Sequence, residues 1–296
     1  DIIIGSSVGA LIGCSVAMGT GMREATQTFY RFVDEVFSRN TNLAQKARRL
    51  SNLWSFYKHD DARVVDILKS VYGDTRLGNL QAHPMLVLCY NPQKSGVEII
   101  SSDDPRYIEL PVWEVCKAAT AAPLYFKPST IQTQVYHESL LDGGLVCNNP
   151  APFGLTHALR VLRLRQQRPD LSRVLLVSLG SGRIREEIKS SFVGQLGMLT
   201  TAPFFGGSEA NHQVLQDLLH ENYHRLQVDI PFDLKGPDRS YNTEALHDLA
   251  EMALEREHAG TLKRIAWQLV FARLQVTDAG STWETRALAD KFAVAG

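Results

Sequence analysis

Residues 1–18 read DIIIGSSVGALIGCSVAM, and this stretch decides the fold. The apolar run at residues 1–4 predicts the end of a buried strand, and the glycine-rich turn GSSVG follows at residues 5–9. Small and apolar side chains from Ala10 to Met18 then predict a helix. A strand that turns directly into a helix indicates an α/β protein, in which helices pack against a sheet.

The rest of the chain continues this alternation. Apolar side chains at helical spacing predict helices over residues 23–37, 61–71, 111–121 and 153–165, and the last third is mainly helical. Apolar runs predict strands over residues 85–90, 97–101, 173–179 and 226–230. We expect the strand at 173–179 to be buried on both faces. The pattern predicts an α/β fold around a mainly parallel sheet.

Composition excludes several classes of protein. A net charge of −1 over 296 residues provides no basic surface, so we expect no nucleic-acid partner. No apolar run approaches the ~20 residues that cross a bilayer. The cysteines form no CxxC pair, which predicts buried free thiols in a reducing, cytoplasmic compartment; they are Cys14, Cys89, Cys116 and Cys147. The histidines form no metal-binding motif, so we expect no metal and no other cofactor. Peripheral membrane attachment and the oligomeric state stay open.

The turn GSSVG is a G-x-S-x-G motif with Ser7 at its centre. A nucleophilic serine must stand clear of its own backbone, which a tight strand-to-helix turn achieves. We expect Gly5 and Gly9 to be required as glycines, because β-carbons at these positions would clash in such a turn. The N–H of Val8, in the first turn of the helix, is expected to donate to an oxyanion. Ser6 occupies the variable position of the motif, which favours a structural or solvated hydroxyl.

A second motif, Leu141-Asp142-Gly143-Gly144, places an acid at a strand end before two glycines. An Asx turn, in which the carboxylate bonds its own backbone, is one interpretation. The other is that Asp142 lies beside Ser7 and accepts the serine proton directly. A free aspartate, with a pKa of ~3.9, is a weak base for an alcohol. Burial raises that pKa, so we expect this pair to share a largely dry pocket.

Two further features allow alternative interpretations. The segment SLGSGR at residues 178–183 is a glycine-rich loop after a strand, but it lacks the complete phosphate-binding patterns. We favour a strand-end turn at the border of the active-site cleft. A histidine after the acid in the chain would complete a Ser–Asp–His triad, as in a triad esterase. The candidates are His212, His220, His224, His247 and His258.

Four separated segments resemble the patatin-like phospholipase family. They are GSSVGALIG at 5–13, AATAAPLYFKP at 118–128, LLDGGLVCNNP at 140–150 and LVSLGSGR at 176–183. Their order and spacing make the resemblance specific, and it extends over residues 1–245. It implies a three-layer α/β/α sandwich with a catalytic domain at 1–245. We expect residues 246–296 to form a helical extension packed on the same domain.

The resemblance also implies an activity. The family hydrolyses fatty-acyl esters of phospholipids or related lipids with a Ser–Asp dyad, which corresponds to Ser7 and Asp142 and needs neither a histidine nor a metal. The lipid substrate would come from a membrane or droplet surface, and we expect the acyl chain among the helices between Arg23 and Phe56. The basic cluster Lys46, Arg48 and Arg49 is expected to be a solvated helix face.

One departure from the family concerns the oxyanion hole. The family carries a glycine-rich loop upstream of the serine turn, and this loop supplies most of the oxyanion donors. Only residues 1–4 precede the turn in the sequence, so we expect a truncated chain of reduced activity. The alternative is a lipid-binding or storage protein that keeps the fold without catalysis.

Overall fold

The computed structural model describes residues 1–37, 61–80, 82–123, 125–133, 135–165, 167–168, 170–184, 192–231 and 243–277. The strands are β1 (Ile3–Ser6), β2 (Met85–Asn91), β3 (Gly96–Ser101), β4 (Ser129–Gln132), β5 (His137–Asp142), β6 (Leu176–Leu179), β7 (Arg183–Ile184), β8 (Tyr223–Leu226) and β9 (Asp229–Ile230). The helices are α1 (Val8–Ala17), α2 (Met22–Phe37), α4 (Asp61–Tyr72), α5 (Val112–Ala119), α6 (Ala151–Leu164), α7 (Phe192–Leu219), α8 (Thr243–Arg256) and α9 (Ala259–Thr277). Short 3-10 turns η1 (Leu77–Asn79), η2 (Gly143–Leu145), η3 (Leu171–Arg173) and η4 (His220–Asn222) connect some of them.

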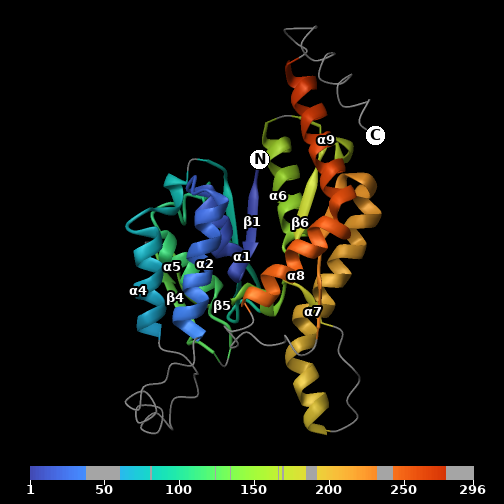
Figure 1. The fold of residues 1–296 in the computed structure, drawn as a ribbon. Coiled ribbons are helices and arrows are strands. Elements are labelled where there is room, and N and C mark those ends of the chain that lie inside the picture. Colours follow the sequence, from blue (N-terminus) through green and yellow to red (C-terminus); the bar gives the residue numbers. More distant parts are fainter. Residues whose placement is uncertain are drawn as a thin grey trace.

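The largest sheet is mixed and has the order β1-β2-β5-β4, with β3 on the other side of β2. Strand β1 pairs parallel with β2, whereas β3 and β5 both pair antiparallel with β2, and β4 pairs antiparallel with β5. Two smaller parallel pairs, β6 with β8 and β7 with β9, lie on the far side of β1. Figure 1 shows how the sheet and the two strand pairs are arranged among the helices.

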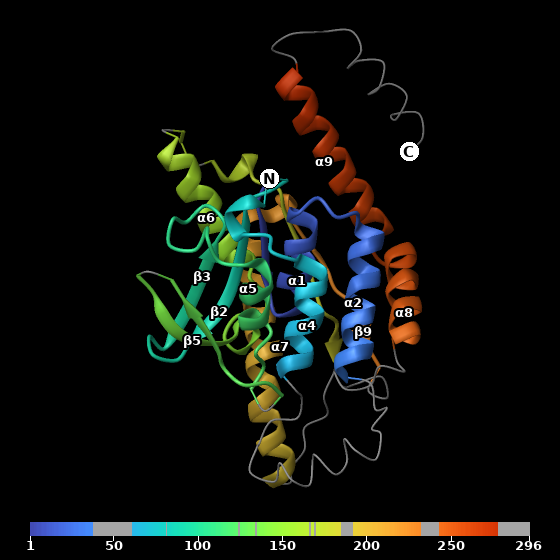
Figure 2. The same cartoon turned by 90° about the vertical axis from the view of Figure 1, so that its left-hand side faces the viewer.

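Helices cover β1 from two sides. Figure 1 shows α1, α2, α4 and α5 on one side and α6 with α7 on the other, and Figure 2 shows the first group in front. Successive strand residues point to opposite faces, and the contacts of β1 follow this rule. Ile3 lies against Gly13 of α1, and Ile4 lies against Gly154 of α6, where a β-carbon on either glycine would come within 3.1 Å of the isoleucine. The strand that leads to Ser7 is thus held between two helices.

The apolar core has two parts. The larger part fills the space between the sheet and α1, α2, α4 and α5, and it contains fully buried side chains such as Met85, Ile100 and Val112. The smaller part joins α6, α7 and β8 through Leu155, Leu215 and neighbouring apolar residues. At about 25 cal/mol per Å² of buried apolar surface, the larger cluster is the main stabilising element of the part of the fold that presents the serine turn.

The predicted α/β class and all five predicted helices of the first 165 residues are confirmed within a few residues at their ends. Gly73 follows α4 at φ +53, the left-handed conformation of a C-cap glycine. Strand β4, the beginning of β5 and the full extent of α7 were not predicted, because β4 and the beginning of β5 carry polar side chains and α7 lacks a clear apolar stripe. The run predicted at 226–230 is divided between β8 and β9.

The expectation that the strand at 173–179 is buried on both faces is wrong. In the described chain β6 begins only at Leu176 and pairs with β8 alone. Val177 and Leu179 are 39% and 73% exposed, whereas the polar side chain of Ser178 is buried. An apolar run predicts a strand, but it does not reveal whether other elements cover both of its faces.

Two predictions concern parts that the structure does not decide. The predicted boundary between residues 1–245 and 246–296 falls inside α8, and the division stays a prediction. The cluster Lys46, Arg48 and Arg49, with residues 38–56 of the expected acyl-chain region, lies outside the described residues. Among the described helices, none combines the length and the apolar character that a membrane crossing requires.

Candidate active site

Ser7 occupies a strained turn between β1 and α1. Its backbone angles are φ 53° and ψ −129°, a conformation that is unfavourable for a residue with a β-carbon. Ser7 is the N-cap residue of α1. Val8 is the first residue of this helix, so its N–H has no acceptor within the helix. The helix dipole adds positive potential at this point.

The register of β2 explains why Ser7 and Asp142 meet. Strand β1 runs parallel to β2 and ends with Ser6 opposite Leu88. Strand β5 runs antiparallel to β2 and ends with Asp142 opposite Cys89, the next residue of β2. The carboxyl ends of β1 and β5 therefore approach each other head to head along β2. Residues 135 positions apart in the sequence come into contact in this way.

The two side chains form a short hydrogen bond. The Ser7 hydroxyl donates to Oδ2 of Asp142 at 2.6 Å, and the N–H of Gly144 donates to Oδ1 at 2.7 Å. Asp142 is 2% exposed, and its burial raises its pKa to about 6, although the two hydrogen bonds oppose this rise. The carboxyl is a stronger base than a solvated aspartate but still ionised at neutral pH. The Asx-turn interpretation and the Ser–Asp contact both hold, each with a different carboxylate oxygen.

The backbone around Asp142 is fixed by neighbouring elements. The N–H of Asp142 donates to the carbonyl of Ala121 at 3.0 Å, which ties β5 to the segment after α5. Sequence reasoning did not predict this contact, since a carbonyl acceptor has no residue-specific signal. A β-carbon on Gly143 would lie 2.3 Å from the carbonyl oxygen of Leu88, so the backbone at this turn can approach β2 only with glycine.

The glycines of the serine turn differ from expectation in one respect. A β-carbon on Gly5 would lie 2.4 Å from the carbonyl oxygen of Gly9, which confirms the close packing expected there. A β-carbon on Gly9 itself would meet nothing within 4 Å, so the expected clash at this position is wrong. The reason is directional, because Gly9 turns its carbonyl group, and not its α-hydrogens, towards Gly5.

The packing around these glycines predicts that alanine destabilises the fold at positions 5 and 143 but not at position 9. We expect Gly143→Ala and Gly5→Ala to lower the free energy of unfolding by about 1–3 kcal/mol or more, because backbone atoms must move to admit the new methyl group. Gly9→Ala is expected to be neutral or to stabilise by up to about 1 kcal/mol through helix propensity. Urea unfolding of the three variants measures the difference. Equal destabilisation by all three would contradict the packing described here.

Other polar groups lie away from the Ser–Asp pair. Ser6 is buried, and its hydroxyl has no hydrogen-bond partner among the described residues. Within the same part of the chain, none of the five candidate histidines contacts Ser7 or Asp142. Four of them have other partners: His212 contacts Tyr223, His224 contacts Gln268, His247 contacts Tyr30 and His258 contacts Gln227. The arrangement favours a dyad over a triad.

Three backbone donors of the glycine-rich loop at residues 178–183 are occupied. The N–H groups of Gly180 and Arg183 donate to the carbonyls of Leu226 and Val228, and that of Gly182 donates to the side chain of Gln227. These donors are not available to cradle a phosphate, which agrees with a strand-end turn. In the described segments, no three ligating side chains are grouped so that they could hold a metal ion.

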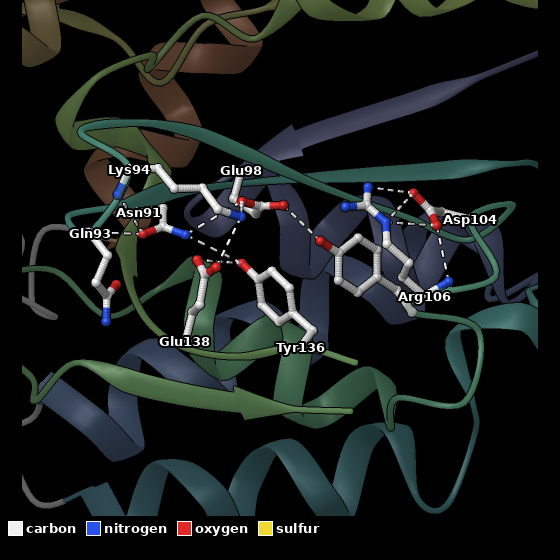
Figure 3. Close-up of polar contacts among 9 residues, drawn as sticks. Asn91, Gln93, Lys94, Glu98, Asp104, Arg106, Tyr136 and Glu138 are labelled. Atoms are coloured by element: carbon white, nitrogen blue, oxygen red, sulfur yellow. Dashed lines mark hydrogen bonds and ion pairs between the residues drawn. The ribbon is translucent and has the colours of Figure 1, made fainter. Parts of the chain in front are cut away.

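A polar cluster holds β5 beside β2 and β3 (Figure 3). Lys94 forms ion pairs with Glu98 of β3 at 2.9 Å and with Glu138 of β5 at 3.0 Å. The amide of Asn91 bridges Glu98 and the hydroxyl of Tyr136, each at 3.4 Å. These contacts join the strand that ends in Asp142 to the hairpin that carries Cys89.

Comparison with known proteins identifies relatives of the chain. The sequence model of the family described as patatin-like phospholipase matches residues 1–154. A cGAMP-activated phospholipase of Pseudomonas aeruginosa is 28% identical over 254 residues, which are 83% of this chain and 72% of that protein. An intracellular phospholipase A2 of Caenorhabditis elegans is 26% identical over 199 residues, which are 62% of this chain and 16% of that protein.

A plant protein is also similar. The probable inactive patatin-like protein 9 of Arabidopsis thaliana is 27% identical over 202 residues, which are 62% of this chain and 50% of that protein. The chain thus spans half the length of this plant relative and a smaller part of the nematode enzyme. The family model covers more than half of the chain and includes both Ser7 and Asp142. The chain belongs to the patatin-like phospholipase family.

Proposed function

We propose that this protein is a lipid acyl hydrolase in which Ser7 is the nucleophile and Asp142 the general base. The observation that carries the proposal is the 2.6 Å hydrogen bond from the serine hydroxyl to a buried carboxylate. A nucleophile and a base within hydrogen-bond reach are the geometric requirement for activating an alcohol. Family membership supports the reaction class, since phospholipases among the relatives act on lipids.

The first half of the reaction acylates the serine. Asp142 accepts the hydroxyl proton while Ser7 Oγ attacks the ester carbonyl carbon, and the carbonyl oxygen becomes an oxyanion. The N–H of Val8 donates to this oxyanion, aided by the dipole of α1. The tetrahedral intermediate then collapses, the bond to the alcohol breaks, and the protonated Asp142 returns its proton to the departing lysolipid or alcohol.

The second half releases the fatty acid. A water molecule replaces the alcohol and gives its proton to Asp142 while its oxygen attacks the acyl carbon. Collapse of the second intermediate breaks the bond to Ser7, which recovers the proton from Asp142 and leaves a free carboxylic acid. The Asp142 carboxylate thus acts as a base and then as an acid in each half of the reaction. A pKa near neutrality suits a group with both roles.

Fatty-acyl esters of phospholipids or related glycerolipids are the proposed substrates. Leu11, Phe29 and Phe32 line a small apolar pocket between α1, α2 and α4, with a volume of about 10 Å³. An acyl chain would enter there only if these side chains moved apart, and the pocket lies in the described part of the helices expected to accept it. The free, buried thiols of all four cysteines suit a reducing, cytoplasmic location.

The pKa of Asp142 predicts the pH dependence of hydrolysis. The base must be ionised to accept the serine proton, so activity is lost as the pH falls through a pKa of about 6. We expect kcat/KM at pH 5 to be about tenfold below its value at pH 8, because only about a tenth of the carboxyl is then ionised. Hydrolysis of a soluble short-chain ester between pH 5 and 8 measures this. A flat profile over that range would exclude Asp142 as the titrating base.

Labelling with a fluorophosphonate tests the proposal directly. This reagent reacts rapidly only with an activated serine, and we expect a single adduct on the peptide that contains Ser7. Ser6→Ala should still label, whereas Ser7→Ala should not. A folded protein that does not label at all would overturn the hydrolase proposal and favour a lipid-binding protein that keeps the fold.

A further inference from the structure

Helix α9 exposes large apolar side chains. Leu262, Leu269, Val270 and Phe271 are each between 38% and 55% exposed among the described residues. Phe271 also lies beside Trp267, with ring centroids 5.8 Å apart. A soluble protein rarely leaves such residues together on one helix unless another surface covers them. We call these four side chains, together with Trp267, the α9 surface.

The charge of α9 is entirely basic. Its sequence contains Lys263, Arg264 and Arg273 and no aspartate or glutamate. The side chains of Lys263 and Arg264 are exposed beside Leu262. The preceding helix α8 carries four carboxylates and one arginine, and the whole chain has a net charge of −1. Positive charge is thus concentrated on α9 rather than shared with its neighbour or the chain as a whole.

Hydrogen bonds of Gln268 anchor the middle of α9. The Oε1 atom of Gln268 lies 2.6 Å from Nε2 of His224 and accepts its hydrogen bond, while Nε2 of Gln268 donates to the carbonyl of Glu221 at 3.0 Å and to Oδ1 of Asn222 at 3.2 Å. These contacts fix the middle of α9 to η4 and to the beginning of β8. In both Figure 1 and Figure 2, the C-terminal half of α9 extends away from the layers formed by the other drawn elements.

We propose that the α9 surface docks on an anionic phospholipid membrane. Apolar and aromatic side chains enter the interface between headgroups and acyl chains, and the neighbouring Lys and Arg side chains pair with lipid phosphates and carboxylates. Tryptophan and phenylalanine rings suit this depth. A second copy of the chain is a less suitable partner, because α9 against α9 brings like charges together. Docking places the protein on its proposed substrate, but it does not depend on catalysis.

Binding to vesicles tests this proposal. The Ser7→Ala protein is used so that lipid is not consumed, with vesicles of phosphatidylcholine alone or mixed with phosphatidylserine. We expect binding to the mixed vesicles to exceed binding to phosphatidylcholine by tenfold or more and to weaken with added salt. Replacement of both Lys263 and Arg264 by Gln should weaken it by about 25-fold, at about fivefold for each basic residue. The double change L269Q and F271Q should weaken binding to a similar degree.

The control variant carries R163Q and L164Q on α6, an exposed basic residue followed by an exposed leucine on another surface. It should bind vesicles as the parent does. Fluorescence gives a second readout, because a blue shift on binding should disappear with Trp267→Phe. The proposal is overturned if the α9 variants bind as well as the control, if lipid charge has no effect, or if the α9 changes instead convert a dimer into monomers by light scattering.

Discussion

Ser7→Ala is expected to abolish hydrolysis, with a loss in kcat of at least ~10⁴-fold. No other nucleophile replaces the lost oxygen, because the neighbouring Ser6 is buried and does not reach Asp142 through any described hydrogen bond. The fold should persist, since the backbone of residue 7 is held by the β1–α1 turn and not by the hydroxyl. Turnover of a soluble ester, together with the melting temperature, measures both effects.

Ser6→Ala is the matched control for this change. It removes a hydroxyl from the adjacent residue without altering the Ser7–Asp142 contact, so we expect activity within a few-fold of the parent. The nucleophile assignment fails if Ser7→Ala retains substantial turnover while Ser6→Ala loses it. Loss of activity in both variants with intact folding would indicate that the turn tolerates no change, and labelling then decides which oxygen reacts.

Asp142→Asn is expected to lower kcat by about 10⁴-fold and, at pH 8, to raise the free energy of unfolding. The amide is not a base, so the serine keeps its proton. The amide group can still accept the hydrogen bond from Gly144 and donate to Ser7, which preserves the local geometry. The variant also removes a buried charge, and that charge costs stability in the folded protein.

The sign of this effect follows from the pKa of Asp142. Burial raises the pKa from an ordinary value of 3.8 to about 6. Between these two values the folded protein binds more protons than the unfolded chain, so the free energy of unfolding falls as the pH rises from about 4 to 6. The decrease is about 3 kcal/mol, at 1.36 kcal/mol per pKa unit, and it persists above pH 6. Asp142→Asn should therefore be more stable than the parent at pH 8 but not at pH 4.

Urea unfolding at pH 4 and pH 8 measures this difference. The control is Asp66→Asn on the exposed surface of α4, which should leave the activity unchanged. A variant at position 142 that is inactive and also less stable at pH 8 would contradict the inferred cost of the buried charge. The expected result is that the ionised carboxylate at position 142 is needed for catalysis but lowers the stability of the fold at pH 8.

Local sequence was sufficient for several features of the fold. The apolar run, the GSSVG turn and the small residues after it predicted β1, the serine turn and α1, because each depends on neighbours within a few positions. The regular spacing of Phe29, Phe32 and Val36 predicted α2 in the same way. The burial of β6 could not be predicted, because exposure of Val177 and Leu179 depends on which distant elements cover the strand.

The sequence likewise predicted some features of the candidate site and not others. Sequence selected Ser7 and Asp142 as separate motifs with the right chemistry, and it required that burial raise the pKa of the acid. It did not distinguish the roles of Gly5 and Gly9, since that difference depends on the direction of a carbonyl group. Nor did it decide between a dyad and a triad, because the histidines of the C-terminal half find their partners only in three dimensions.

The sequence by itself determined that a strained serine and an acidic turn are present, because strand, turn and helix signals are local. Only the tertiary structure decided that they meet. Strands β1 and β5 approach each other along β2 from opposite directions. Their last residues lie opposite Leu88 and Cys89, which are adjacent residues of β2. That register is set by packing over the whole sheet, which no short segment of sequence specifies.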